Sequence, residues 1–352
     1  MQNFTPHALD KILEQLPKQG WLVLGEALSN LSCLGLFPIY PDQREKFVKE
    51  YEAKNIAALV SFDGNTLTEA QVKDRLAQKL FLPVSQEYLG RQVDILNNIL
   101  NKLSGAKGES RPSFNAELAA DCFKEIESQF DLSSGNFSPE VFVSEEKRIV
   151  LEQVLASVIK RSDFNENIIE ALLLHYNIQK IKPFKLHNNL LAKIFSQYLL
   201  VQAGLPLWKI SALNQHFNIT KTEYLRRIDA EIETAGVDFI IYALRGLSDG
   251  WKTQIIQLSA MQNDICWSVL LEKEFAGNSE GERRQKILMQ ELSRKSDVVE
   301  RNDLAYMSQQ VNEMYKHRHP RTLMRDIKDL EDKRLIIREG KFYRVNKESI
   351  KV

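Results

Sequence analysis

The stretch from 182 to 193 constrains the fold more than any other part of the chain. It reads Lys-Pro-Phe-Lys-Leu-His-Asn-Asn-Leu-Leu-Ala-Lys, a proline and a short polar loop followed by the start of an apolar run. This order predicts a loop that opens into a buried helix, against which the rest of the chain has to pack. The apolar residues of the run, at helical spacing, are Leu190, Leu191, Ile194, Phe195, Tyr198 and Leu199.

The same stretch resembles the motif of the Fic domain family, His-Pro-Phe-x-Asp/Glu-Gly-Asn-Gly-Arg-x-x-Arg. Pro183, Phe184 and Asn188 match, and the other defined positions differ. As a family, these proteins transfer AMP from ATP to protein hydroxyls. The order of segments from about residue 50 to 265 is also similar to that of the family. The resemblance implies a mainly α fold, with a Fic-like helical core and a short β-hairpin flap.

The departures from the motif remove groups that the family reaction needs. Lys182 stands at the position of the catalytic base, and an ammonium group has no free lone pair with which to accept a proton. Leu186 replaces the carboxylate that holds magnesium, and a leucine cannot coordinate a hard cation. His187 places a side chain where a glycine lets phosphate approach the backbone amides.

The two phosphate-binding arginines of the motif are lost as well. Leu190 and Lys193 occupy their positions, so one guanidinium fork is absent and the other is reduced to a point charge. We therefore expect a Fic-like pseudoenzyme with no catalytic residue, no cofactor and no metal. The alternative is a divergent transferase that moves AMP or another phosphate-containing group from ATP with magnesium. In that case Lys182, Asn188 and Lys193 are the nucleotide-binding candidates, and His187 is a displaced base.

A second resemblance lies at Asp63-Gly64-Asn65, a strong turn signal followed by Thr68 as a candidate N-cap. The turn is similar to the N-terminal region of many Fic proteins, where a helix ends in a glutamate that inhibits the enzyme by reaching an active-site arginine. Asp63 replaces that glutamate, and position 190 holds no arginine. The resemblance thus implies an inhibitory-type helix with nothing to inhibit. The residues by themselves predict a helix-turn-helix junction.

Two polar segments interrupt the helical pattern ahead of the motif. Residues 104–113 are rich in glycine and broken by proline, which predicts a loop, and they lack Walker spacing. Residues 134–139 lead into an alternating stretch at 140–144, which predicts a strand or a hairpin. The resemblance places the flap here, where an extended segment of a protein partner would dock by edge pairing. The expected flap residues are Val141, Phe142 and Val143.

The pattern of predicted elements changes at residues 275–281, which we interpret as a linker. Beyond it, the spacing predicts helices at 283–294, at 302–316 and from 320 onwards, then a hairpin that turns at Glu339-Gly340. This order is that of a winged helix-turn-helix domain, which many Fic proteins carry at the C-terminus. We divide the chain into an N-terminal helical region at 1–110, similar to the Fic N-terminal region, a Fic-like core at 111–275 and a winged helix at 276–352.

A winged helix contacts DNA by placing its third helix in the major groove. Basic residues gather at the start of that helix and on the wing, in a chain that balances 47 Lys and Arg against 47 Asp and Glu. Four acids lie close by and would repel phosphate if they shared the face, namely Asp326, Asp329, Glu331 and Asp332. Winged helices also dock proteins or form dimers, so duplex DNA and a protein partner are both open. The DNA-contact candidates are Lys316, Arg318, Arg321, Thr322, Arg325, Lys341 and Arg344.

Composition narrows the class of protein further. The 352 residues, 43% of them hydrophobic, carry no formal net charge, which argues against a globally basic nucleic-acid binder. The three cysteines lie far apart and lack metal-ligand spacing, which favours reduced thiols. The sequence has neither a leader pattern nor an apolar run of membrane-spanning length. We expect a cytoplasmic, bacterial homodimer that acts as a regulator.

Overall fold

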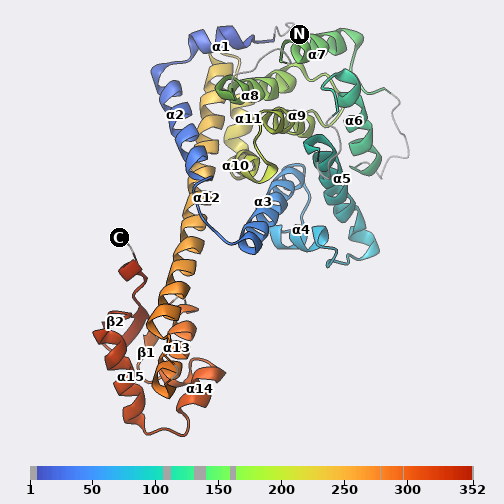
Figure 1. The fold of residues 1–352 in the computed structure, drawn as a ribbon. Coiled ribbons are helices and arrows are strands. Elements are labelled where there is room, and N and C mark those ends of the chain that lie inside the picture. The colour runs from blue at the N-terminus through green and yellow to red at the C-terminus, as the bar shows by residue number, and fades with distance from the viewer. Residues whose placement is uncertain are drawn as a thin grey trace. The chain divides into compact units, whose positions relative to one another are not determined.

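The computed structural model describes residues 6–105, 112–130, 140–158, 164–277, 279–295 and 297–350 (Figure 1). The described chain is mainly helical and contains one small antiparallel sheet. Packing groups the chain into two units. The N-terminal unit comprises Met1–Leu36 and Tyr40–Ile255, and the C-terminal unit comprises Phe37–Ile39 and Ile256–Val352. The three-part division at 110 and 275 stays a prediction.

The N-terminal unit is built from helices that surround one central helix. Its elements are α1 (Leu9–Gln15), α2 (Lys18–Cys33), α3 (Pro41–Phe62), α4 (Glu69–Leu76), η1 (Val84–Gln86), α5 (Glu87–Ser104), α6 (Ala116–Phe130), α7 (Glu145–Val158), α8 (Phe164–Ile181), α9 (Asn188–Gln202), α10 (Leu207–Ile219), α11 (Lys221–Asp229) and the first part of α12 (Ala235–Glu274).

The central helix is α9, which packs against α5, α6, α8 and α10. Every residue from Leu190 to Val201 is buried, polar ones included. A helix that is buried on all sides belongs to the interior of a large core, because no face of it has to meet water. The predicted buried helix after the motif loop is therefore confirmed.

Two short signals ahead of the core are confirmed as well. Gly64 follows the end of α3 with a φ of 96°, a left-handed conformation that glycine adopts without steric cost. Thr68 caps α4, since its hydroxyl accepts from the Gln71 backbone N–H and the Gln71 side chain accepts from the Thr68 N–H. The turn thus fixes the direction in which the chain leaves α3.

The C-terminal unit combines helices with a three-stranded antiparallel sheet in the order β1-β3-β2. After the end of α12 come α13 (Glu280–Ser293), β1 (Val299–Glu300), η3 (Leu304–Tyr306), α14 (Gln309–Tyr315), α15 (Pro320–Asp332), β2 (Ile336–Glu339), β3 (Phe342–Val345) and η4 (Lys347–Ile350). The helices and the hairpin follow the order that the sequence predicted, with the strand β1 in addition. The hairpin turns at Gly340, which has a φ of 67°.

Two details of this unit differ from the sequence prediction. The helix expected at 302–316 is divided into η3 and α14, because the Ser308 hydroxyl accepts from the Val311 N–H and starts a new helix there. The strand β1 was not predicted. It is only two residues long and pairs with β3 through Val299 and Glu300, so it leaves no alternating pattern to detect.

Several predictions concern segments at the edge of what the structure describes. Residues 106–111, within the polar loop at 104–113, and residues 131–139, ahead of the flap, lie outside the described residues. The described part of the flap makes a single β-bridge, between Phe142 and Phe184, and no strand. Cys33, Cys122 and Cys266 are free thiols. None of the described helices has the length and apolar character needed to cross a bilayer.

Candidate functional site

The motif loop follows α8 and is closed by the first residue of α9. The side chain of Asn188 accepts from the Phe184 N–H over 3.0 Å and donates to the Phe184 carbonyl over 2.7 Å. Two residues at the ends of the loop have a left-handed backbone conformation, Lys182 with a φ of 48° and His187 with a φ of 57°. Since both amide groups of Asn188 are engaged with the backbone, this side chain holds the loop closed.

The flap segment pairs with the motif loop itself. The Val143 N–H donates to the Pro183 carbonyl over 2.9 Å, and the Lys185 N–H donates to the Val141 carbonyl over 3.1 Å. The rings of Phe142 and Phe184 also stack, 5.5 Å apart. The edge of the flap that faces the loop is therefore paired within the chain.

Asn189 is a polar hub that the sequence analysis missed. It occupies the position of the second glycine in the family motif. Its Oδ1 accepts from Gln179 Nε2 over 3.1 Å and from the Tyr224 hydroxyl over 2.8 Å, and its Nδ2 donates to Asp63 Oδ1 over 3.4 Å. A glycine replaced by an amide was the available signal, because an amide brings both donors and an acceptor to the start of α9.

A buried histidine extends this hub into the core. His175 is fully buried, and its Nε2 lies 2.7 Å from the Tyr224 oxygen. Because Tyr224 donates its proton to Asn189, the Nε2 position of His175 must carry the proton of this second bond. Burial and, secondarily, the charge of Lys193 lower the pKa of His175 well below its usual value, so the ring is neutral. Burial likewise raises the pKa of Tyr224 well above 10.0.

Lys193 is buried against the aromatic ring of Phe62. Only 1% of it is exposed, and its Nζ lies 3.0 Å from the centroid of the Phe62 ring. Burial lowers the pKa of Lys193 well below its usual value, with the Asp63 charge acting in the opposite direction. No hydrogen bond to this amine occurs among the described residues. The residues at the end of the inhibitory-type helix, Phe62 and Asp63, therefore do have partners at the motif, which the sequence analysis did not foresee.

The remaining motif residues are divided between the surface and the core. Lys182 is exposed, Leu186 is 47% exposed, and Leu190 is fully buried. The ring of His187 lies 6.2 Å from that of Phe123. In the described part of the chain, no group of three His, Cys, Asp or Glu side chains is arranged to hold a metal ion. Asn65 caps its own turn instead, donating to the Leu89 carbonyl and accepting from the Leu67 N–H.

Two of the four acids of α15, Asp326 and Asp329, point inward. Asp326 is 2% exposed and accepts from Arg284 Nε over 3.0 Å and from the Tyr315 hydroxyl over 2.8 Å. Asp329 accepts from Gln285 Nε2 over 3.1 Å. The two acids closest to the centre of the helix are thus bound to α13 and α14, and they do not lie on the exposed face.

The exposed face of α15 is basic over its first two turns. Arg321, Arg325 and Lys328 follow one another at steps of four and three residues, which places them on one side of a helix. All three are exposed, and none forms an ion pair among the residues that the structure describes. Lys328 was not among the sequence candidates, although its spacing to Arg321 and Arg325 was the signal for it.

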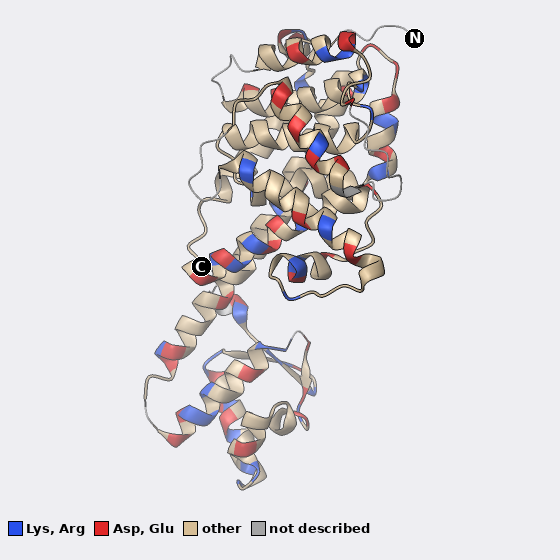
Figure 2. Ribbon diagram, turned by 90° about the vertical axis from the view of Figure 1, so that its right-hand side faces the viewer, with Lys and Arg blue, Asp and Glu red and all other residues tan. Residues whose placement is uncertain are grey.

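The other DNA-contact candidates have different surroundings. Thr322 is partly buried, and Lys316 is exposed without an ion pair in the described chain. Arg318 pairs with Glu280, Lys341 with Glu300 over 3.1 Å, and Arg344 with Glu339 over 2.6 Å. Acidic and basic residues are interspersed along the helices generally (Figure 2), so an unpaired basic stripe is a local feature.

Comparisons with known proteins support the fold alone. No family model matches the sequence, and no curated protein matches it either. The crystal structure of a Fic family protein from Desulfovibrio desulfuricans G20 is similar over 97% of this chain and 98% of its own, with 13% identity and a TM-score of 0.54. A Fic domain containing signaling protein from Bacteroides thetaiotaomicron is similar over 69% of this chain and 98% of its own, with 16% identity and a TM-score of 0.50.

Proposed function

We propose that this chain, which has the fold of Fic-family proteins, is a non-catalytic regulator that binds duplex DNA through the exposed face of α15. The observation that carries the proposal is the sorting of charge on this helix. Arg321, Arg325 and Lys328 are exposed without carboxylate partners among the described residues, whereas Asp326 and Asp329 are bonded to α13 and α14.

This sorting suits a helix that enters the major groove. Phosphate contacts from lysine and arginine supply most of the affinity of a DNA-binding protein, and an arginine can also bond guanine through its guanidinium fork. Arg321 lies in the first turn of α15, where a recognition helix meets base edges, and Arg325 lies one turn further on. An acid on the same face would repel the backbone. Asp326 and Asp329 do not lie on this face, because they are bonded to side chains of α13 and α14. The exposed Asp332, four residues beyond Lys328, marks the end of the basic face.

The hairpin is a weaker contact in this proposal. Lys341 and Arg344 are both paired with glutamates, which DNA would have to displace. An exposed pair contributes little to stability, so displacing it costs little. We infer that α15 dominates the affinity and that the hairpin adds to it.

The proposal of inactivity rests on the motif loop. Catalytic transfer of a phosphate-containing group needs a base for the attacking hydroxyl and cations that meet the phosphates. Lys182 offers no lone pair while it is protonated, and Lys193 is buried against Phe62. Asn188 and Asn189 are hydrogen bonded within the chain. These contacts support a loop that stabilises the core and has no nucleotide to hold.

Calorimetric titration of the full chain tests both halves of the proposal. Duplex DNA of about 20 bp should bind and weaken by at least tenfold between about 50 and 200 mM salt, because bound phosphates release counterions. ATP with magnesium should give no binding heat. Tight, magnesium-dependent ATP binding would favour the divergent transferase instead, and absence of DNA binding at the lower salt concentration would overturn the regulator.

A further inference from the structure

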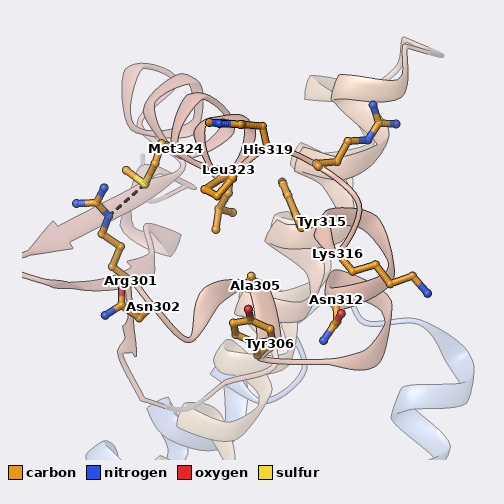
Figure 3. A pocket seen from close by; sticks show the side chains of 12 residues that line it. Arg301, Asn302, Ala305, Tyr306, Asn312, Tyr315, Lys316, His319, Leu323 and Met324 are labelled. Carbon is orange, nitrogen blue, oxygen red and sulfur yellow. Dashed lines mark hydrogen bonds between the residues drawn. The ribbon is translucent and has the colours of Figure 1, made fainter.

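The C-terminal unit contains a pocket that the proposed function does not use. It has a volume of about 410 Å³ and lies between the segment after β1, α14 and the start of α15 (Figure 3). Ala305, Leu323 and Met324 supply apolar surface, while Arg301, Tyr306 and His319 surround the opening. Small-molecule sites have this size and this combination of apolar walls with a few polar groups.

The charge of the lining selects a class of ligand. Three Lys and Arg residues and no Asp or Glu line the pocket within the described chain. Arg318 is paired with Glu280, so Arg301 and Lys316 are the two that have no carboxylate partner among the residues the structure describes. Figure 3 places these two residues on opposite sides of the opening. A ligand that carries negative charge therefore fits the pocket, and a cationic one does not.

Arg301 has a weak partner that a ligand could replace. Its Nε lies 3.1 Å from the sulfur of Met324, the one side-chain atom to which it donates among the described residues. A thioether is a poor acceptor, whereas a carboxylate or phosphate takes two parallel bonds from a guanidinium. The side chain is exposed, so it can turn to a ligand without breaking an ion pair.

The apolar part of the pocket favours a flat group. Tyr306 lines the pocket and is 73% exposed, so the face of its ring is available to a ligand. Leu323 lies between Tyr306 and His319 in the close-up view, with its methyl groups toward the cavity (Figure 3). An aromatic ring placed on Leu323 would cover apolar surface that now meets water.

We propose that this pocket binds a small amphipathic anion, with a flat apolar group on Leu323 and Tyr306 and an acidic group on Arg301. The site is separate from the basic face of α15. Leu323 follows Arg321 by two residues, so the two side chains lie on different sides of the helix. The proposal therefore does not depend on DNA binding.

The test is calorimetric titration of the full chain with three probes. The first, 2-naphthoate, has both features; 2-naphthamide has the ring without the charge; inorganic phosphate has the charge without the ring. We expect 2-naphthoate to bind at least about tenfold more tightly than either of the others, because only it meets Arg301 and Leu323 together. Equal binding of 2-naphthoate and 2-naphthamide, or no binding of 2-naphthoate at millimolar concentration, would overturn the proposal.

Two variants locate the binding. Arg301→Gln should weaken 2-naphthoate by about tenfold and leave 2-naphthamide unchanged, since only the anion loses its partner. Leu323→Trp should abolish binding of both aromatic probes by filling the pocket. Arg283→Gln, a change at an exposed arginine of α13 outside the pocket, is the matched control and should change nothing. Binding of 2-naphthoate that survives both Arg301→Gln and Leu323→Trp would place it elsewhere and overturn the site.

Discussion

Polar side chains of the motif loop and of the exposed face of α15 differ in their burial and in their contacts. At the loop, Lys193 is buried against Phe62, and Asn189 is hydrogen bonded to three side chains of its own chain. On α15, Arg321 and Arg325 are exposed without ion pairs among the described residues. Lys193 and Asn189 of the motif are thus engaged within the fold, whereas Arg321 and Arg325 have no such contacts among the described residues.

This difference shows why a motif has to be judged by its contacts. A side chain whose hydrogen bonds or ring contacts are complete within the fold stabilises that fold, and recruiting it for a ligand would break those contacts. An exposed cation without an ion pair can contact a ligand without breaking any such contact. This difference is why we propose that the function lies in the C-terminal unit.

The largest expected effect comes from Asp326→Ala, which breaks the inward anchoring of α15. The Arg284 guanidinium would remain buried without its partner, and breaking a buried ion pair costs about 3–5 kcal/mol. Hydrogen exchange over residues 280–345 should show this loss. Asp329→Ala, which removes a bond at a more exposed position, should cost about 1 kcal/mol or less. Equal protection in the two variants would contradict the inward role of Asp326.

The next effect is on DNA affinity. Replacing Arg321 and Arg325 together with glutamate should weaken duplex binding by at least about 100-fold, because two favourable contacts become repulsive. The dependence of the binding constant on salt should also become shallower, by about one unit for each phosphate contact that is lost. Fluorescence anisotropy with a labelled duplex measures both quantities. Affinity that stays within threefold of the native chain would exclude α15 as the main contact.

A smaller effect, on the stability of the N-terminal unit, tests the buried position of Lys193. Lys193→Met should stabilise the N-terminal unit by about 1–2 kcal/mol near neutral pH, since an apolar chain of similar length replaces a buried amine. The pKa of Lys193 is lowered on folding, so the native protein gains stability as pH rises toward the unfolded pKa of about 10.4. The advantage of the variant should therefore shrink with rising pH in urea denaturation. A variant that is several kcal/mol less stable would mean that the amine has an essential charged partner.

The smallest effect concerns pH below neutrality. The pKa of His175 is lowered in the folded state, so below the unfolded value of about 6.5 the unfolded chain binds a proton that the folded chain does not. Stability should fall as pH decreases, with this residue contributing about 1.4 kcal/mol per pH unit. The pKa values of His7 and His216 are lowered too, chiefly by burial, so the measurement is the difference between the native chain and His175→Gln. Parallel pH profiles would contradict the neutral, buried ring.

Local patterns predicted most of the fold. The buried helix after the motif, the Thr68 cap and the hairpin turn at Gly340 each follow from a short sequence signal, and each is confirmed. The two-residue strand β1 and the break at Ser308 were missed. Both depend on pairing or capping partners that a periodic pattern does not reveal.

The site was less predictable because its contacts join distant segments. Asn189 meets Asp63 and Tyr224, which are 126 and 35 residues away in the chain. The orientation of Asp326 toward Arg284, 42 residues away, decides whether the exposed face of the first two turns of α15 is basic or mixed in charge. Residue type is enough to identify these side chains as candidates for a site, but only tertiary packing shows which way they face.

Duplex DNA affinity of two matched variants tests the central claim most directly. In one, Arg321 and Arg325 become glutamine; in the other, two exposed lysines of the motif loop, Lys182 and Lys185, become glutamine. The two proteins lose the same charge. We expect at least tenfold weaker binding in the α15 variant, through lost phosphate or base contacts, and no change in the loop variant. Equal loss in both variants, or loss in the loop variant alone, would contradict the assignment of function to α15.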